Sequence, residues 1–140
     1  MQNILTKKNI QADYLPELLL KQLRYETNTW KRLLDFLMDE NIRFKNRLSE
    51  ILEYRFNKDL LEEVERFQSR FIQQDEFISL LSNEIAETEK LLAGKISRNG
   101  LLIPEADKKL KRMRKNMMSA EKRFGRIKTM FNHFLAESIL

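Results

Sequence analysis

Cysteine is absent from the 140-residue chain. Disulfide bonds, thiolate catalysis and cysteine-ligated zinc or iron–sulfur clusters are therefore excluded. A chain without cysteine also suits a reducing compartment. We expect a cytoplasmic protein on this basis.

Glycine, proline and long apolar runs are also scarce. The chain has three glycines and two prolines, and its longest apolar runs are three residues long. Such runs are far too short to span a membrane, and the first 13 residues lack the apolar core of a signal peptide. With 42% hydrophobic and 34% charged residues, the composition is typical of long helices or coiled coils in a single domain.

The few turn-forming residues suggest where helices begin and end. Pro16 is followed by an acidic residue and Pro104 by two, which is the pattern of a first helical turn. Gly94 is typical of a helix end, and Asn99-Gly100 of a tight turn. We therefore expect a loop over residues 93–103.

A second break is predicted at residues 57–59, where Asp59 could cap a helix and Glu62 complete a capping box. The predicted helices span residues 16–56, 59–93 and 104–138. They form one domain over residues 16–140, preceded by a polar segment over residues 1–15.

Apolar residues recur at alternating spacings of three and four within each predicted helix, which is the heptad pattern of coiled coils. These seam positions are Leu20, Leu23, Thr27, Trp30, Leu34, Leu37, Asn41, Phe44, Leu48, Ile51 and Arg55; Leu60, Val64, Phe67, Phe71, Gln74, Ile78, Leu81, Ile85, Thr88 and Leu92; and Ile103, Ala106, Leu110, Met113, Met117, Ala120, Phe124, Ile127, Phe131 and Phe134. The phase shifts by two residues between the first two seams, which supports a turn there. We predict an all-α fold, an elongated antiparallel bundle of three long helices with coiled-coil-like seams.

The seams are broader than a two-stranded coiled coil requires, because further apolar residues flank them. The flanking residues are Leu33, Phe36, Met38, Phe77, Leu80, Leu91, Met130 and Leu135. Three helices would leave part of this apolar surface uncovered. We therefore expect a homo-oligomer, most simply a dimer.

Charge is distributed unevenly between the predicted helices. Residues 105–128 hold ten basic and three acidic residues, a net charge of +7, whereas residues 59–89 hold nine acidic and two basic residues, a net charge of −7. One interpretation is that the third helix binds an anionic partner such as nucleic acid or a membrane surface. The candidate binding residues are Lys108, Lys111, Arg112, Arg114 and Lys115.

The alternative interpretation is structural, because flanking charges often set the partner and direction of helices. In an antiparallel hairpin of the second and third helices, Glu84, Glu87 and Glu89 would lie near residues 108–115. Residues 59–65 would lie near residues 122–128. The two interpretations are compatible, since ten cations cannot all face one helix.

No motif for catalysis, cofactor binding or metal binding is present. His133 is the single histidine, without the glutamate three residues before it that a di-iron bundle requires; we expect it in a helix interface. The polar seam residues Asn41, Gln74 and Thr88 are typical of positions that fix register. The predicted function is therefore a non-enzymatic interaction or scaffold protein that self-associates and binds protein partners. Anion binding by the third helix is the alternative.

Overall fold

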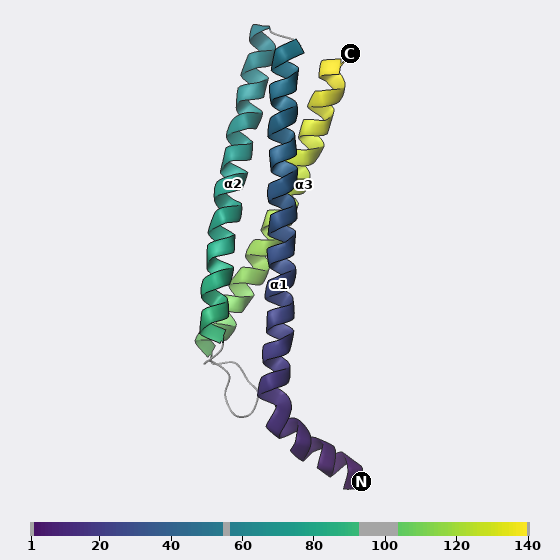
Figure 1. Cartoon of the computed structure of the whole chain (residues 1–140), viewed down its shortest axis with the longest axis vertical. Helices are drawn as coiled ribbons and strands as arrows, with labels where there is room; N and C mark the ends of the chain where they lie inside the picture. The colour runs from purple at the N-terminus through teal and green to yellow at the C-terminus, as the bar shows by residue number, and fades with distance from the viewer. Residues whose placement is uncertain (1, 55–56, 93–103, 140) are drawn as a thin grey trace.

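The protein is a bundle of three long helices in an up-down-up arrangement, as predicted (Figure 1). The computed structural model describes residues 2–54, 57–92 and 104–139, with side chains described from residue 17 to residue 138 outside the two gaps. Helix α1 spans Gln2–Tyr54, α2 spans Lys58–Leu92 and α3 spans Pro104–Ile139. Helices α1 and α2 are antiparallel, as are α2 and α3, and α3 crosses α1 at an angle (Figure 1).

The predicted start of the first helix at residue 16 was wrong, because α1 begins at Gln2. Pro16 lies inside the helix, where a proline has no amide hydrogen to donate to the helical hydrogen bonds. A proline in such a position can kink a helix without ending it. The N-terminal part of α1 accordingly bends away from the axis of the remainder (Figure 1). Beyond this bend α1 is continuous through residues 39–41.

The sequence predicted that Asp59 caps the start of α2, and this prediction was wrong, because Asn57 is the cap. The Asn57 side-chain oxygen accepts a hydrogen bond from the backbone amide of Leu60 at 2.7 Å, which is the N-cap geometry. Asp59 lies in the first turn, where its charge favours the positive end of the helix. At the start of α3, Pro104 occupies the first helical position, as predicted. The predicted loop over residues 93–103 lies outside the described residues.

The core coincides with the predicted seams. Every buried residue in the described part of the chain is a seam position, and the other described seam residues are half-buried. A heptad repeat places these side chains on one stripe of each helix, so the three stripes meet along the bundle axis. Of the eight apolar residues that flank the seams, four are half-buried against this core and four are exposed.

An aromatic cluster fills the half of the core nearer the α1–α2 turn. Its rings belong to Phe44, Phe67, Phe71, Phe124, Phe131 and Phe134, with centroids of neighbouring rings 5.1–6.1 Å apart. Large rings at these spacings gain pairwise aromatic stabilisation in addition to their buried area. All three helices contribute to the cluster, which therefore joins them.

Asn41 is the polar seam residue that links two helices. Its side-chain amide donates hydrogen bonds to the Phe71 carbonyl at 2.8 Å and to the Asp75 carboxylate at 2.6 Å. Asp75 also forms an ion pair with Lys45. The buried Asn41 oxygen and Gln74 amide nitrogen have no hydrogen-bond partner among the described residues. This layer stabilises α1 against α2 in one register but leaves polar atoms unsatisfied, the usual compromise at a polar seam position.

Candidate anion-binding face of α3

Each side of α3 has a different environment, which follows from its heptad positions. The seam points into the core, one flanking row faces α1 and the other faces α2. The α1-facing row consists of Asp107, Arg114, Glu121, Lys128 and Leu135, and the α2-facing row of Lys109, Asn116, Arg123, Met130 and Glu137. The remaining positions face away from the bundle. The ten cations of residues 105–128 are therefore divided among three surfaces.

The cations of the α1-facing row pair with glutamates of α1. Arg114 donates hydrogen bonds to both carboxylate oxygens of Glu26, at 2.6 and 3.0 Å. These hydrogen bonds raise the pKa of the Arg114 guanidinium above its ordinary value. Two heptads further along both helices, Lys128 lies 3.8 Å from Glu40. These pairs keep α1 and α3 parallel in a single register.

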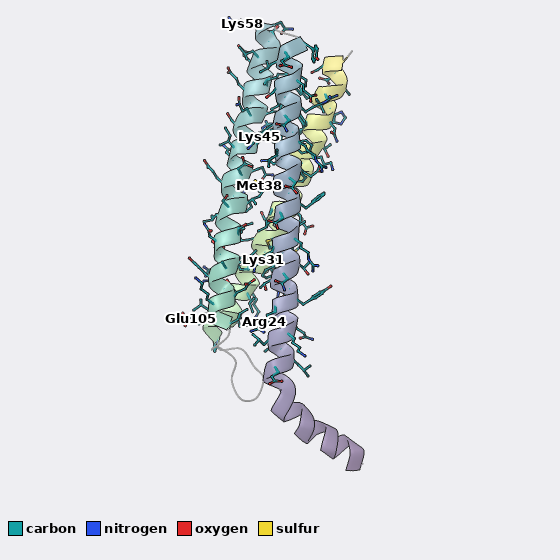
Figure 2. The ribbon with its side chains drawn as sticks, in the orientation of Figure 1. Arg24, Lys31, Met38, Lys45, Lys58 and Glu105 are labelled. Atoms are coloured by element: carbon teal, nitrogen blue, oxygen red, sulfur yellow. The ribbon has the colours of Figure 1, made fainter. Side chains whose placement is uncertain are left out.

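The α2-facing row forms fewer ion pairs than the opposite net charges of residues 59–89 and 105–128 suggest. Lys109 lies 3.9 Å from Glu87, and the guanidinium of Arg123 stacks 4.4 Å from the ring centre of Phe77. Glu89 pairs with Lys31 of α1 at 2.7 Å instead of with α3. Figure 2 labels Lys31 and Lys45, which both pair with acidic residues of α2, at different levels of the bundle.

The predicted proximity of residues 59–65 to residues 122–128 was wrong. Arg123 lies level with Phe77, and Arg70 contacts the Met130 sulfur at 3.8 Å. This register places the start of α2 beside the last turns of α3, where Asp59 and Glu63 line a hollow together with Glu137 and Ser138. The acidic start of α2 therefore does not neutralise the basic residues of α3.

Five of the six cations on the outward positions of α3 have no ionic partner among the described residues; the sixth, Lys111, pairs with Asp107. The five are Lys108, Arg112, Lys115, Lys122 and Arg126, which we call the basic face. All five are exposed, and none of the ion pairs in the described part of the chain includes them. At ~1.5 Å rise per residue the basic face is about 27 Å long.

No acidic side chain interrupts the basic face. Glu121, the only acid of the chain between Asp107 and Glu137, belongs to the α1-facing row. The outward positions between the cations include Met118, which is 60% exposed, and Gly125, beside which no heavy atom lies within 4 Å of the site of a Cβ. The result is an open surface of one charge sign.

The predicted binding residues divide into two groups in the structure. Lys108, Arg112 and Lys115 belong to the basic face, and Lys111 lies beside it, paired with Asp107 of the same helix at 2.9 Å. Arg114 faces α1 and pairs with Glu26. Lys122 and Arg126, which also belong to the basic face, were not among the predicted binding residues. Their spacing was the available signal, because Lys122 follows Lys115 by one heptad and Arg126 follows Arg112 by two.

The prediction that His133 lies in a helix interface was wrong, because its side chain is exposed. It lines a groove of about 340 Å³ between α2 and α3, together with Glu63, Arg66, Phe67, Arg70, Met130, Phe134 and Glu137. Within the described ranges, no three histidine or carboxylate side chains are placed to hold a metal ion. No helix in the described part of the chain has a stretch long and apolar enough to cross a membrane.

Comparison with known proteins gives no match: no family model fits the chain, and neither a curated protein nor a solved structure is significantly similar to it.

Proposed function

We propose that this protein is a non-enzymatic, cytoplasmic interaction protein that binds a polyanionic partner through the basic face of α3. The observation that supports this proposal is the absence of ionic partners for Lys108, Arg112, Lys115, Lys122 and Arg126 within the described bundle. The flanking cations of α3 stabilise the fold, whereas these five contribute no such contact.

The basic face is unfavourable for the isolated bundle. Lys108 and Arg112 are four residues apart, as are Lys122 and Arg126, and Arg112 and Lys115 are three apart. Like charges at these spacings are neighbours on a helix and destabilise it by about 0.2–0.5 kcal/mol per pair. A bound polyanion would remove this repulsion. Relief of this repulsion would therefore add to the free energy of binding.

The arrangement of titratable groups favours binding over catalysis. A catalytic site gathers groups with shifted pKa values in a cleft. The guanidinium of Arg114, whose pKa is raised, belongs to a structural pair with Glu26 and not to a cleft. His133 lies at the edge of an open groove beside Glu63 and Glu137, without a hydroxyl nucleophile among the residues that line it.

Self-association is a second candidate function, favoured by apolar side chains that the bundle leaves uncovered. Phe36, Leu80, Leu91 and Met130 are between 44% and 55% exposed. A second copy could cover such residues, and homo-oligomers with two-fold symmetry are common. Light scattering at micromolar concentration should give the mass of a dimer. A monomeric mass would contradict self-association and leave the proposal for the basic face intact.

Binding of a simple polyanion tests the proposed function. In the face variant, Lys108, Arg112, Lys115, Lys122 and Arg126 are each changed to Gln. In the matched control variant, the same change is made at five exposed cations elsewhere: Lys21, Arg24, Arg32, Lys58 and Lys90. Both variants lose five positive charges, so they differ only in where the charges were.

We expect the wild-type protein and the control variant to bind labelled inorganic polyphosphate at 100 mM salt. The face variant should lose this binding while keeping the helical circular dichroism spectrum, because its substitutions remove no contact that holds the bundle together. Equal loss of binding in both variants would mean that only net charge matters, and would contradict the proposal.

A further inference from the structure

We infer that the partner of the basic face is double-stranded nucleic acid, held through its phosphate backbone without reading of the bases. This inference rests on the proposed function, because it names the polyanion. It depends on the length of the basic face, on its shape and on the residue types that it lacks.

The length and width of the basic face match a duplex. Lys108, Lys115 and Lys122 form one row at heptad intervals of about 10.5 Å, and Arg112 and Arg126 form an adjoining row. Their combined length of about 27 Å approaches the ~34–36 Å of one duplex turn. Duplex DNA presents one phosphate charge per ~1.7 Å of its axis, so phosphates lie within reach all along the face. A helix about 10–12 Å wide also fits a major groove about 12 Å wide.

Single-stranded nucleic acid is a poorer match, because proteins bind it by stacking bases on exposed aromatic rings. The basic face carries no aromatic residue. The most exposed aromatic side chains of the described residues, Tyr25, Phe36 and Tyr54, belong to α1.

A membrane surface is a poorer match as well. Helices that lie on membranes insert a continuous apolar face beneath the headgroups. The apolar side of α3 is buried in the bundle, with Met113, Met117 and Phe124 in the core. Met118 is the exposed apolar side chain within the basic face, and a single methionine contributes little insertion.

An acidic protein surface is also less suitable. Stable protein interfaces depend on a buried centre of aromatic or aliphatic anchors, with charges at the rim. The basic face offers charges over its whole length and Met118 as its single apolar contact. Charge complementarity with regularly spaced phosphates requires no such anchor.

The experiment compares ligands by fluorescence anisotropy with the full-length chain. The probes are two 20-base-pair duplexes of unrelated sequence, one single strand of equal length, polyglutamate and vesicles containing phosphatidylserine. Each probe is titrated at several salt concentrations with the wild-type protein, the face variant and the control variant.

If all five cations contact phosphates, the logarithm of the affinity for a duplex should fall with the logarithm of salt concentration with a slope of about −4.5. This slope corresponds to a roughly 500-fold loss of affinity between 50 and 200 mM salt. Both duplexes should bind equally, and the single strand, polyglutamate and vesicles more weakly. The face variant should lose binding to the duplex, and the control variant should keep the slope.

The outcomes separate the two proposals. Binding of polyglutamate or vesicles at least as tight as that of the duplexes at 150 mM salt would overturn the duplex inference and leave the polyanion proposal standing. Tighter binding of the single strand would have the same consequence. If the wild-type chain binds none of these probes, and no polyphosphate either, both proposals are overturned.

Discussion

Phe131 is the side chain whose loss should most disturb the bundle. It is fully buried, and its ring lies 5.1–6.1 Å from those of Phe44, Phe67, Phe71 and Phe134. Replacing Phe131 with Ala would remove these ring contacts from α1, α2 and α3 together. The surrounding rings are held by three separate helices, so they can collapse only partly into the resulting cavity.

The size of the effect follows from this environment. Phe→Ala substitutions in a core lower the free energy of unfolding by about 3–5 kcal/mol. Four aromatic neighbours place Phe131→Ala in the upper half of that range, at about 4–5 kcal/mol. For a domain of this size the melting temperature should fall by roughly 10–15 °C. Many domains have a free energy of unfolding of ~5–15 kcal/mol, so the variant should keep only part of the wild-type stability.

Urea unfolding followed by circular dichroism at 222 nm measures the change, with the midpoint shifting at nearly constant m-value. Phe36→Ala is the matched control, because Phe36 is 53% exposed and should lose less than about 1 kcal/mol. The reasoning would be refuted if Phe131→Ala were no more destabilising than Phe36→Ala, since the aromatic cluster would then not hold the helices together.

Three further substitutions test other parts of the structure by urea unfolding. Asn41→Leu should raise the free energy of unfolding by roughly 1 kcal/mol, because it replaces a buried polar seam residue whose oxygen is unsatisfied, while Asp75 keeps its ion pair with Lys45; light scattering should then detect additional oligomers if Asn41 also fixes register. Asn57→Ala should lower stability by about 1 kcal/mol through loss of the N-cap, and Asn57→Gly by only a few tenths. Arg114→Gln should lower it by up to about 1 kcal/mol, since the pair with Glu26 is partly exposed. Lys115→Gln, one residue away on the basic face, should leave stability unchanged or slightly raised, and equal losses at the two positions would contradict the division of α3 into surfaces.

The core could be predicted from sequence because it depends on a local repeat. Once Leu110 and Met113 define a phase, the positions of Phe124 and Phe131 on the same stripe follow from helix geometry. The helix ends were less predictable. Pro16 is tolerated inside α1 at the expense of a kink, and Asn57 and Asp59 are both good capping residues, so only the observed hydrogen bond distinguishes them.

The binding face was only partly predictable because it depends on how the helices are arranged. The seam shows that Arg114 lies on a flank and Lys115 on the outside. It does not show that the flank faces α1, where Glu26 is available, since this depends on the hand of the bundle. The opposition of acidic and basic segments also depends on the stagger between α2 and α3. At the observed stagger, the acidic start of α2 lies beside the last turns of α3 and not beside residues 122–128.

The most direct test of the central claim is a map of where a duplex protects the protein. Exposed lysines are acetylated with a small reagent, with and without a 20-base-pair duplex, and the modified positions are quantified by mass spectrometry. We predict strong protection of Lys108, Lys115 and Lys122 on the basic face, with unchanged modification of Lys21, Lys58 and Lys90 elsewhere on the surface. Equal modification of both sets in the presence of saturating duplex, or protection of the second set alone, would contradict the assignment of the basic face as the binding surface.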